Sequence, residues 1–373
     1  MRGAVPARTQ APVRAQAPNA ASRRRVPPPR PNARQLYPER VKQRKRTRLL
    51  KRVGAVVLAL VLVLAGVGAG YALWYSAALD SALSMGGDQD ASVESALVPA
   101  KAGEPFYMLV LGSDSREGSG TSNKAAESGD NQRSDVIILL RVDAASKQVT
   151  MVSVPRDTPL RLEDGSLVKI NEAYNIGGAE HSIRAVSELT GVPISHYAEV
   201  HFSELQQIVD ALGGVTVDVD VELSYQDALT GETVTVEPGT QTLTGQQAQI
   251  FARARHEYQT DQDAHRQSNV RSLAAAIVEA VLAKPVTELP GTVLDLAGYV
   301  GTDLRTADIV SLALGFAGGS GGMTMYSCTG PSDGAINEEA GGLWMCYEDP
   351  EGWAQLMAAV DAGKDPGNID AGS

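Results

Sequence analysis

The feature that most constrains this chain is an uncharged stretch, VGAVVLALVLVLAGVGAGYALWY, at residues 53–75. As a helix rising about 1.5 Å per residue, it is long enough to cross the roughly 30 Å hydrocarbon core of a bilayer. Tyr71, Trp74 and Tyr75 lie at its far end, and aromatic side chains favour the membrane–water interface. We therefore predict one transmembrane helix over residues 53–75.

The segment before this stretch is strongly basic. Residues 1–52 contain sixteen Lys and Arg residues against one acidic residue, Glu39. The positive-inside rule places this tail in the cytoplasm and the residues beyond the helix outside the cell. The alternative, a cleaved signal peptide, fits poorly because the leader is long and the apolar run exceeds the usual 7–15 residues. The Pro/Ala-rich tail should be disordered and attracted to lipid, and nucleic acid is not an expected partner.

Beyond the anchor, the pattern indicates one large extracellular domain. Residues 76–103 are small, polar and acidic, which is typical of a stalk, and residues 364–373 read as a flexible tail. Between them, over residues 104–363, strand-like runs such as FYMLVLG alternate with helical segments such as GAEHSIRAVSELTG. We expect an α/β fold in which helices flank a mixed central β-sheet, an α/β/α sandwich, preceded by one transmembrane helix.

A predicted β-hairpin carries charge at its open end. Two apolar runs, residues 136–142 and 149–154, flank a polar turn, which is the pattern of an antiparallel pair. Arg133 and Asp135 precede the first run, and Arg156 and Asp157 follow the second. Because the start of one hairpin strand lies beside the end of the other, these four residues should gather at one edge of the sheet.

Other segments add charge to the same edge. If residues 106–112 pair in parallel with the second hairpin strand, Asp114 joins Asp135 there. LTGQQAQIFARARH begins with a capping-box spacing and ends in Arg253 and Arg255. The next predicted helix has one face that is ionic in its first turn and apolar afterwards, made of Asp263, Arg266, Val270, Leu273, Ile277 and Val281.

These residue types describe a pocket for a lipid diphosphate. Carboxylates without nearby His suit a hard cation such as Mg²⁺. Arginine forks bind diphosphate oxygens in pairs, and an apolar stripe suits a hydrocarbon tail. The alternative is that the charges form surface ion pairs and that the stripe packs in the core.

Six ordered segments resemble the LytR-CpsA-Psr family: LVLGSDSR, RSDVIILLRVD, VTMVSVPRDT, KINEAYNIGG, HYAEVHFSELQQIVDALGGVTVDV and LTGQQAQIFARARH. The resemblance covers residues 106–282. It implies a membrane-anchored enzyme of Gram-positive bacteria that moves a glycopolymer from a polyprenyl-diphosphate carrier onto peptidoglycan. The site would bind Mg²⁺, the lipid-linked glycopolymer and peptidoglycan.

The resemblance also implies residue roles. Asp114 and Asp135 would bind the metal, and Asp263 matches a further acidic residue of the site. The family often has Gln near the position of Asn269, and the sequence leaves open whether Asn269 makes the contact of that Gln. The arginines would bind the diphosphate or stabilise the site: Arg133, Arg156, Arg253, Arg255 and Arg266. Lys169 is a weaker candidate for the same role. The apolar residues of the stripe described above, Val270, Leu273 and Ile277, would line a lipid tunnel.

The expected reaction is phosphoryl transfer, in which a peptidoglycan hydroxyl attacks the phosphorus that bears the glycan. Asp114 or Asp263 would take the proton, and the sequence leaves the choice open. Two other classes stay open: a polyprenyl-diphosphate hydrolase, and an envelope protein that binds polymer or carrier without catalysis.

Two cysteines, Cys328 and Cys346, lie in segments that read as strands, MTMYSCTG and LWMCYE. Two thiols in an oxidising compartment predict one disulfide if these strands are antiparallel neighbours. Two buried free thiols are the alternative.

Overall fold

The structure is a computed structural model, and it describes residues 33–113, 134–226, 233–285, 287–317, 322–338 and 340–368. The chain divides into two compact units, Met1–Ala69 and Gly70–Ser373. Helix α1 (Ala33–Leu83) contains a segment, Ala55–Leu83, that by length and composition could cross a membrane. The predicted apolar helix is present, but α1 begins at Ala33, so residues 33–52 are helical rather than disordered.

The second unit includes the last turns of α1. Leu79 and Leu83 of α1 are buried against the domain, as is Val93 of α2 (Gly87–Ala96). Most of the predicted stalk, residues 76–103, is therefore packed structure. The prediction failed because small and acidic residues dominate the segment, while a few apolar ones, such as Leu79, Leu83 and Val93, pack against the domain.

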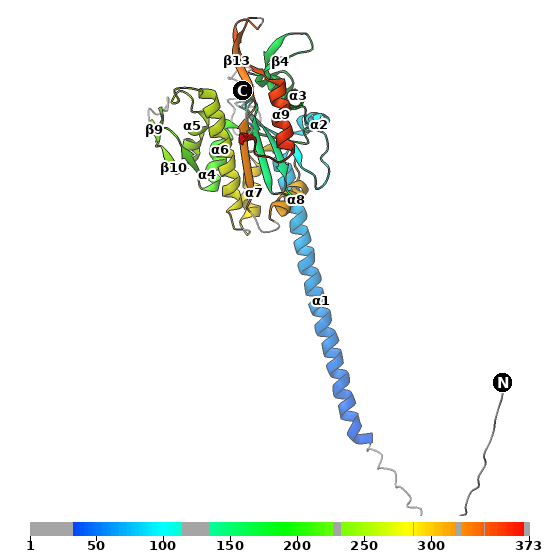
Figure 1. Cartoon of the computed structure of the whole chain (residues 1–373). Helices are drawn as coiled ribbons and strands as arrows, with labels where there is room; N and C mark the ends of the chain where they lie inside the picture. Colours follow the sequence, from blue (N-terminus) through cyan, green and yellow to red (C-terminus); the bar gives the residue numbers. More distant parts are fainter. Residues whose placement is uncertain are drawn as a thin grey trace, which may run out of the picture. The chain divides into compact units, whose positions relative to one another are not determined.

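The central sheet lies in the domain that follows α1 (Figure 1). It has six strands in the order β11-β6-β1-β2-β3-β12, in which the edge strands are β11 (Gly301–Thr302) and β12 (Thr324–Thr329). Strands β2 (Ser134–Asp143) and β3 (Gln148–Ser153) form the predicted antiparallel hairpin. Strand β1 (Phe106–Ser113) pairs antiparallel with β2 and parallel with β6 (His196–His201). The expected pairing of residues 106–112 with the second hairpin strand is wrong, because β2 lies between them.

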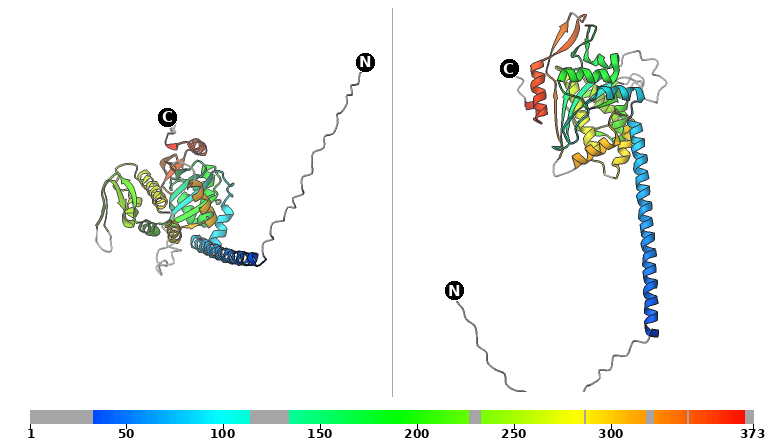
Figure 2. Two further views of the ribbon diagram at one scale, coloured as in Figure 1. Left: turned by 90° about the horizontal axis from the view of Figure 1, so that it is seen from below. Right: turned by 90° about the vertical axis from the view of Figure 1, so that its right-hand side faces the viewer.

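Alternating side chains of β2 build a hydrophobic core on each face of this sheet. Helices cover both faces (Figure 2). Ile137 and Leu139 of β2 belong to one hydrophobic cluster, and Val136 and Ile138 belong to the other. The first cluster includes α3 (Ala173–Thr190) and α9 (Pro350–Asp361). The second includes α4 (Phe202–Leu212), α5 (Gly245–Arg253) and α6 (Gln262–Leu282). The predicted α/β/α sandwich is confirmed.

Shorter elements extend this sandwich. A 3-10 turn, η3, lies within the tail predicted to be flexible. Four pairs of short strands lie outside the central sheet: β4 (Pro159–Arg161) with β5 (Leu167–Lys169), β7 (Val215–Val219) with β10 (Gly239–Leu243), β8 (Leu223–Gln226) with β9 (Thr233–Val236), and β13 (Ser332–Asn337) with β14 (Leu343–Glu348). The remaining elements are η2 (Ile170–Glu172), α7 (Leu289–Ala297), β11 (Gly301–Thr302), α8 (Thr306–Ala317) and η3 (Pro366–Asn368).

The predicted disulfide is contradicted by the topology. Cys328 lies in β12 (Thr324–Thr329), which pairs in parallel with β3 at the edge of the central sheet. Cys346 lies in β14, which pairs with β13 in a separate sheet. The two strands are not neighbours, and both cysteines are free thiols. The prediction failed because β12 pairs with a strand far away in the sequence.

Candidate functional site

The site lies at the open end of the β2–β3 hairpin. Ser134 of β2 pairs with Ser113 of β1, and the backbone N–H of Val154 donates to the carbonyl of Ile137 at 2.9 Å. This register brings the residue after Ser134 beside the chain that leaves β3. Three of the four charged residues predicted to gather are therefore close together: Asp135 meets Arg156, and Asp157 lies beside Arg156, whereas Arg133 lies outside the described residues.

Asp135 and Arg156 form a close ion pair. Nη1 of Arg156 donates to Oδ1 of Asp135 at 2.5 Å. Burial would lower the pKa of Arg156, but Asp135, Asp157 and Asp263 outweigh it and raise the pKa. Arg156 stays cationic, and its buried Nε has no hydrogen-bond partner among the described residues. That N–H is a donor in a cationic site with no acceptor of its own.

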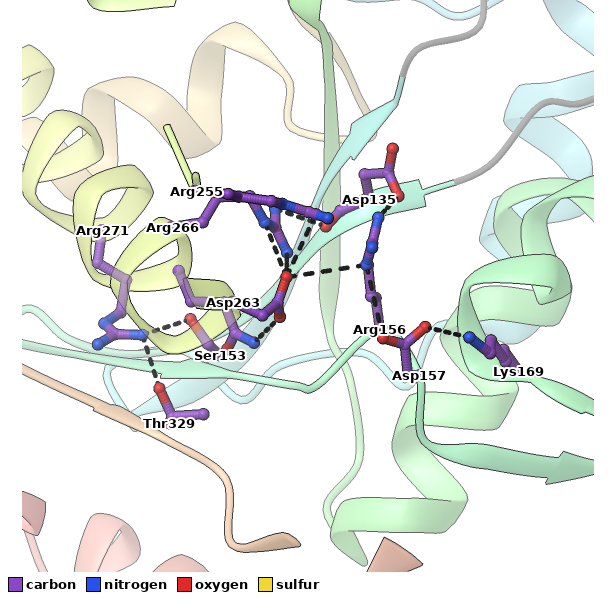
Figure 3. A network of polar contacts seen from close by, with 11 residues as sticks. Asp135, Ser153, Arg156, Asp157, Lys169, Arg255, Asp263, Arg266, Arg271 and Thr329 are labelled. Carbon is purple, nitrogen blue, oxygen red and sulfur yellow. Dashed lines mark hydrogen bonds and ion pairs between the residues drawn. The ribbon is translucent and has the colours of Figure 1, made fainter. Parts of the chain in front are cut away.

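Three guanidinium groups surround one carboxylate oxygen, Oδ1 of Asp263 (Figure 3). Nε and Nη2 of Arg266 each lie 3.0 Å from it, and Nη2 of Arg255 lies 3.2 Å away. Nε of Arg156 is 3.9 Å away. Burial would raise the pKa of Asp263, but Arg266, Gln267 and Arg255 together lower it. Asp263 is therefore an anion that holds three cations together.

The first turn of α6 explains how these groups meet. Asp263 and Arg266 are three residues apart, so both lie on one side of the helix. Arg266 is only 3% exposed, and its Nη1 also donates to the carbonyl of Asp135 at 3.0 Å. Arg255 arrives from the chain after α5, and burial and the neighbouring Arg266 and Arg156 lower its pKa. A bound anion would offset both the burial of this guanidinium and the repulsion from its two cationic neighbours.

A second ion pair extends the network along the sheet edge. Nζ of Lys169, the last residue of β5, donates to Oδ1 of Asp157 at 2.8 Å. Nε of Arg156 is 3.8 Å from Oδ2 of Asp157. The network thus joins four cationic and three anionic side chains from five segments of the chain: Asp135, Arg156, Asp157, Lys169, Arg255, Asp263 and Arg266.

Four further residues were predicted to belong to the site. Asp114 and Arg133 lie outside the described residues. Arg253 ends α5 with an exposed side chain, and Arg255 forms an ion pair with Asp263 in the network. Asn269 is buried, and its Nδ2 donates to the carbonyl of Phe251 and to the hydroxyl of Tyr258, each at 3.1 Å. Asn269 therefore ties α6 to the end of α5.

Sequence reasoning missed three contributors. Asp157 was noted only as a charge, although it holds Lys169. Nε2 of Gln267 donates to Oδ2 of Asp263 at 2.7 Å, and its position directly after Arg266 was the available signal. Arg271 is buried, and its Nη1 donates to the hydroxyls of Ser153 at 2.8 Å and Thr329 at 3.0 Å, which links α6 to β3 and β12.

The apolar face of α6 packs in the second hydrophobic cluster. Leu273 is 2% exposed, and Val270 and Ile277 are partly buried against the same cluster. These contacts are those of a core helix, so Leu273 has a packing role. Further along, Val278 and Leu282 are exposed. The lipid tunnel stays a prediction.

Of the two aspartates predicted to bind the metal, Asp135 lies in the described part of the chain and Asp114 does not. Asp135 lies at the network edge with about a third of its side chain exposed, so it can take a hard cation as well as Arg156. Within the described residues, no group of three His, Cys, Asp or Glu side chains forms a metal-binding cluster. The fit to Mg²⁺ thus depends on Asp114 in addition to Asp135.

Comparison with known proteins places this site in context. A family model, the LytR_cpsA_psr family, matches residues 72–351. Biofilm regulatory protein A of Streptococcus mutans is 32% identical over 189 residues, which cover 48% of this chain and 45% of that protein. A polyisoprenyl-teichoic acid–peptidoglycan teichoic acid transferase, TagU of Halalkalibacterium halodurans, is 31% identical over 235 residues, which cover 61% and 71%. The chain thus spans less than half of the first relative and about seven tenths of the second.

Solved structures share the fold. Bacillus subtilis TagV superposes with a TM-score of 0.56 at 21% identity, covering 71% of this chain and 99% of that one. A structure of TagT bound to LIIa-WTA gives a TM-score of 0.54 at 20% identity, covering 71% and 94%. At these identities, the likeness concerns the fold.

Proposed function

Because the chain belongs to the LytR_cpsA_psr family, we propose that it is a phosphotransferase that moves a glycopolymer from a polyprenyl-diphosphate carrier onto a hydroxyl of peptidoglycan. The observation that carries the proposal is the gathering of Arg156, Arg255 and Arg266 around Asp263 at the open end of the hairpin. Planar guanidinium forks fit diphosphate oxygens, and a preorganised cationic cluster stabilises the charge of a phosphoryl-transfer transition state. Relatives named as teichoic acid transferases support the same reaction class.

In this proposal the arginines have distinct tasks. Arg156 and Arg255 are partly exposed and bind the diphosphate, with Nε of Arg156 as an available donor. Arg266 is buried, so it orients Asp263 and the start of β2. Lys169 keeps Asp157 in place beside Arg156.

Mg²⁺ would be held by Asp135 and Asp114 and would neutralise charge on the diphosphate oxygens. Removal of divalent cations with EDTA should abolish turnover, and added Mg²⁺ should restore it. Unchanged turnover after complete chelation would mean that the reaction does not need the metal.

The proton of the attacking hydroxyl needs an acceptor. Asp263 has a lowered pKa and three cationic neighbours, which makes it a weak base. We therefore propose a positioning role for Asp263, and Asp114 would accept the proton through a carboxylate oxygen that does not bind Mg²⁺. The peptidoglycan hydroxyl attacks the phosphorus that bears the glycan, the bond from that phosphorus to the bridging oxygen breaks, and polyprenyl phosphate leaves.

The hydrocarbon chain would follow α6. This helix begins at the charged network and rises about 24 Å from Arg266 to Leu282, at about 1.5 Å per residue. Val270, Leu273, Ile277, Val278 and Leu282 give it an apolar surface for much of that length, part of it exposed. Only the outward-facing members would touch lipid.

The test uses the full chain in vesicles that contain a polyprenyl-diphosphate-linked glycan, with and without peptidoglycan. Transfer predicts that glycan becomes attached to peptidoglycan and that little is released when the acceptor is absent. Free glycan phosphate at the same rate in both samples would identify a hydrolase. The absence of any product from a donor that the protein binds would identify a binding protein.

A further inference from the structure

The membrane-proximal turns of α1 hold a part of the domain close to the predicted interface. The hydroxyl of Tyr75 donates to the carbonyl of Pro290 in α7 at 2.9 Å. Thr306, the first residue of α8, donates through its backbone N–H to Oδ1 of Asp80 at 2.7 Å, and its hydroxyl is 3.3 Å from the carbonyl of Ser76. Helices α7 and α8 are therefore fixed to residues 75–80 of α1.

The distances place α8 at headgroup level. Tyr71, Trp74 and Tyr75 form the aromatic end of the predicted span. Asp80 lies five residues beyond Tyr75, a rise of about 7.5 Å along the helix. The headgroup layer on each side of a bilayer is roughly 5–8 Å thick. The start of α8 thus falls at the outer limit of this layer.

The outward face of α8 is apolar and has no cover within the described chain. Leu314 is 69% exposed and Val310 is 50% exposed, and they lie one helical turn apart with Ala307 on the same side. Residues 309–316, IVSLALGF, carry no charge. On its other side, α8 packs Ile309 against Leu79 and Leu83 of α1 and seats Gly315 against Ala144 of the β2–β3 turn.

We propose that the outward face of α8 inserts into the membrane, so that the domain rests on the bilayer through a second contact beside its anchor. The partner is the headgroup layer of the leaflet that the domain faces. The contact is continuous with the anchor, because α8 is hydrogen-bonded to the turns of α1 that follow Tyr75. An apolar helix face at this depth is removed from water by lipid without any rearrangement of the domain.

The proposed membrane contact and the charged network lie at opposite ends of β2. This strand spans about 26 Å from Asp143 to Asp135, at roughly 3.3 Å per residue.

The test uses the full chain in phosphatidylglycerol-containing vesicles, with a photoreactive p-benzoylphenylalanine in place of a single residue. A probe at Leu314 should give a lipid adduct, as should a probe at Trp74 in the anchor. A probe at Ile336 in β13 is the matched control, because Ile336 is 62% exposed and apolar but lies at the other end of the domain, and it should give none (Figure 1). Lipid adducts at Trp74 alone, or an adduct between two protein chains at Leu314, would overturn the proposal.

A charge should remove the contact without unfolding the protein. With the probe at Val310, Leu314→Asp should lower the yield of lipid adduct several-fold, whereas Ile336→Asp should leave it unchanged. Leu314 is largely exposed, so Leu314→Asp should melt in detergent at the wild-type temperature. An adduct yield at Val310 that is the same in Leu314→Asp and wild type would contradict insertion of this face.

Discussion

The two ends of the β2–β3 hairpin differ in almost every property. The open end carries Asp135 and Arg156, α6 brings Asp263 and Arg266 to it, and the chain after α5 brings Arg255. The closed end turns through Ala144 and packs against Gly315 in the uncharged stretch of α8, residues 309–316. A single continuous sheet therefore separates a charged site from an apolar surface by about 26 Å, at roughly 3.3 Å per residue of β2.

The comparison teaches that residues near one another in sequence can serve unrelated purposes. Changes at the open end should alter chemistry, because the charges there contribute little to packing. Changes at the closed end should alter stability or membrane contact and leave the chemistry of each folded molecule intact.

The largest effect should come from Arg255→Met. Arg255 is partly exposed and contacts Asp263, so its loss removes a diphosphate donor without opening the core. Turnover should fall about a hundredfold or more, the cost of removing one transition-state donor. Arg184→Met is the matched control, because Arg184 forms a surface pair with Glu180. If both variants lose the same activity, the open end has no special role.

The next-largest effect should distinguish binding of the lipid tail from binding of the diphosphate. Val278→Asp combined with Leu282→Asp should impair long-chain carriers about tenfold more than short-chain analogues, because an exposed apolar surface of one or two side chains is lost. Comparison of kcat/KM for the two donors measures the ratio. An equal loss for both chain lengths would mean that the tail does not follow the end of α6.

At the closed end, Gly315→Val should cost stability. A Cβ at position 315 would lie 2.8 Å from the Cβ of Ala144, so α8 must shift. The cost should be about 1–3 kcal/mol, typical of overpacking. Thermal unfolding in detergent measures it, and turnover per folded molecule with a short-chain donor should stay at the wild-type value. A selective loss of that turnover would break the separation of the two ends.

The smallest effect concerns acid stability. The pKa of Asp263 is lowered in the folded protein, so its contribution to stability is present above the ordinary carboxyl pKa of about 4 and is lost as the pH falls through the folded value. The free energy of unfolding should therefore decline less steeply below about pH 5 in Asp263→Asn than in wild type. Urea unfolding from pH 6 to pH 3 measures the two slopes, and parallel curves would argue against the lowered pKa.

Local patterns in the sequence predicted the parts of the fold that depend on local forces. The alternation of residues 136–142 and 149–154 predicted the hairpin, and the charges at its ends predicted the meeting of Asp135 and Arg156. The spacing of Asp263 and Arg266 predicted their shared side of α6. The Thr244–Gln247 capping box also forms at the start of α5.

Long-range pairing was beyond the reach of these patterns. Nothing local specifies that β2 separates β1 from β3, or that β12 joins the sheet edge and keeps Cys328 away from Cys346. Nor does periodicity distinguish a lipid-facing stripe from a core stripe, so the burial of Leu273 had to come from the structure. The packing of residues 76–96 was missed because a few apolar residues, such as Leu79 and Val93, outweigh an acidic composition.

The central claim is that the charged open end transfers a phosphoryl group with its glycan. The most direct measurement uses the full chain in vesicles, peptidoglycan, and a donor labelled with ³²P at the phosphorus that bears the glycan. The account predicts that the label appears in peptidoglycan, in a phosphodiester, and that the polyprenyl phosphate released is unlabelled. Label that stays on the lipid while glycan reaches the wall, or that leaves as soluble glycan phosphate, would contradict it.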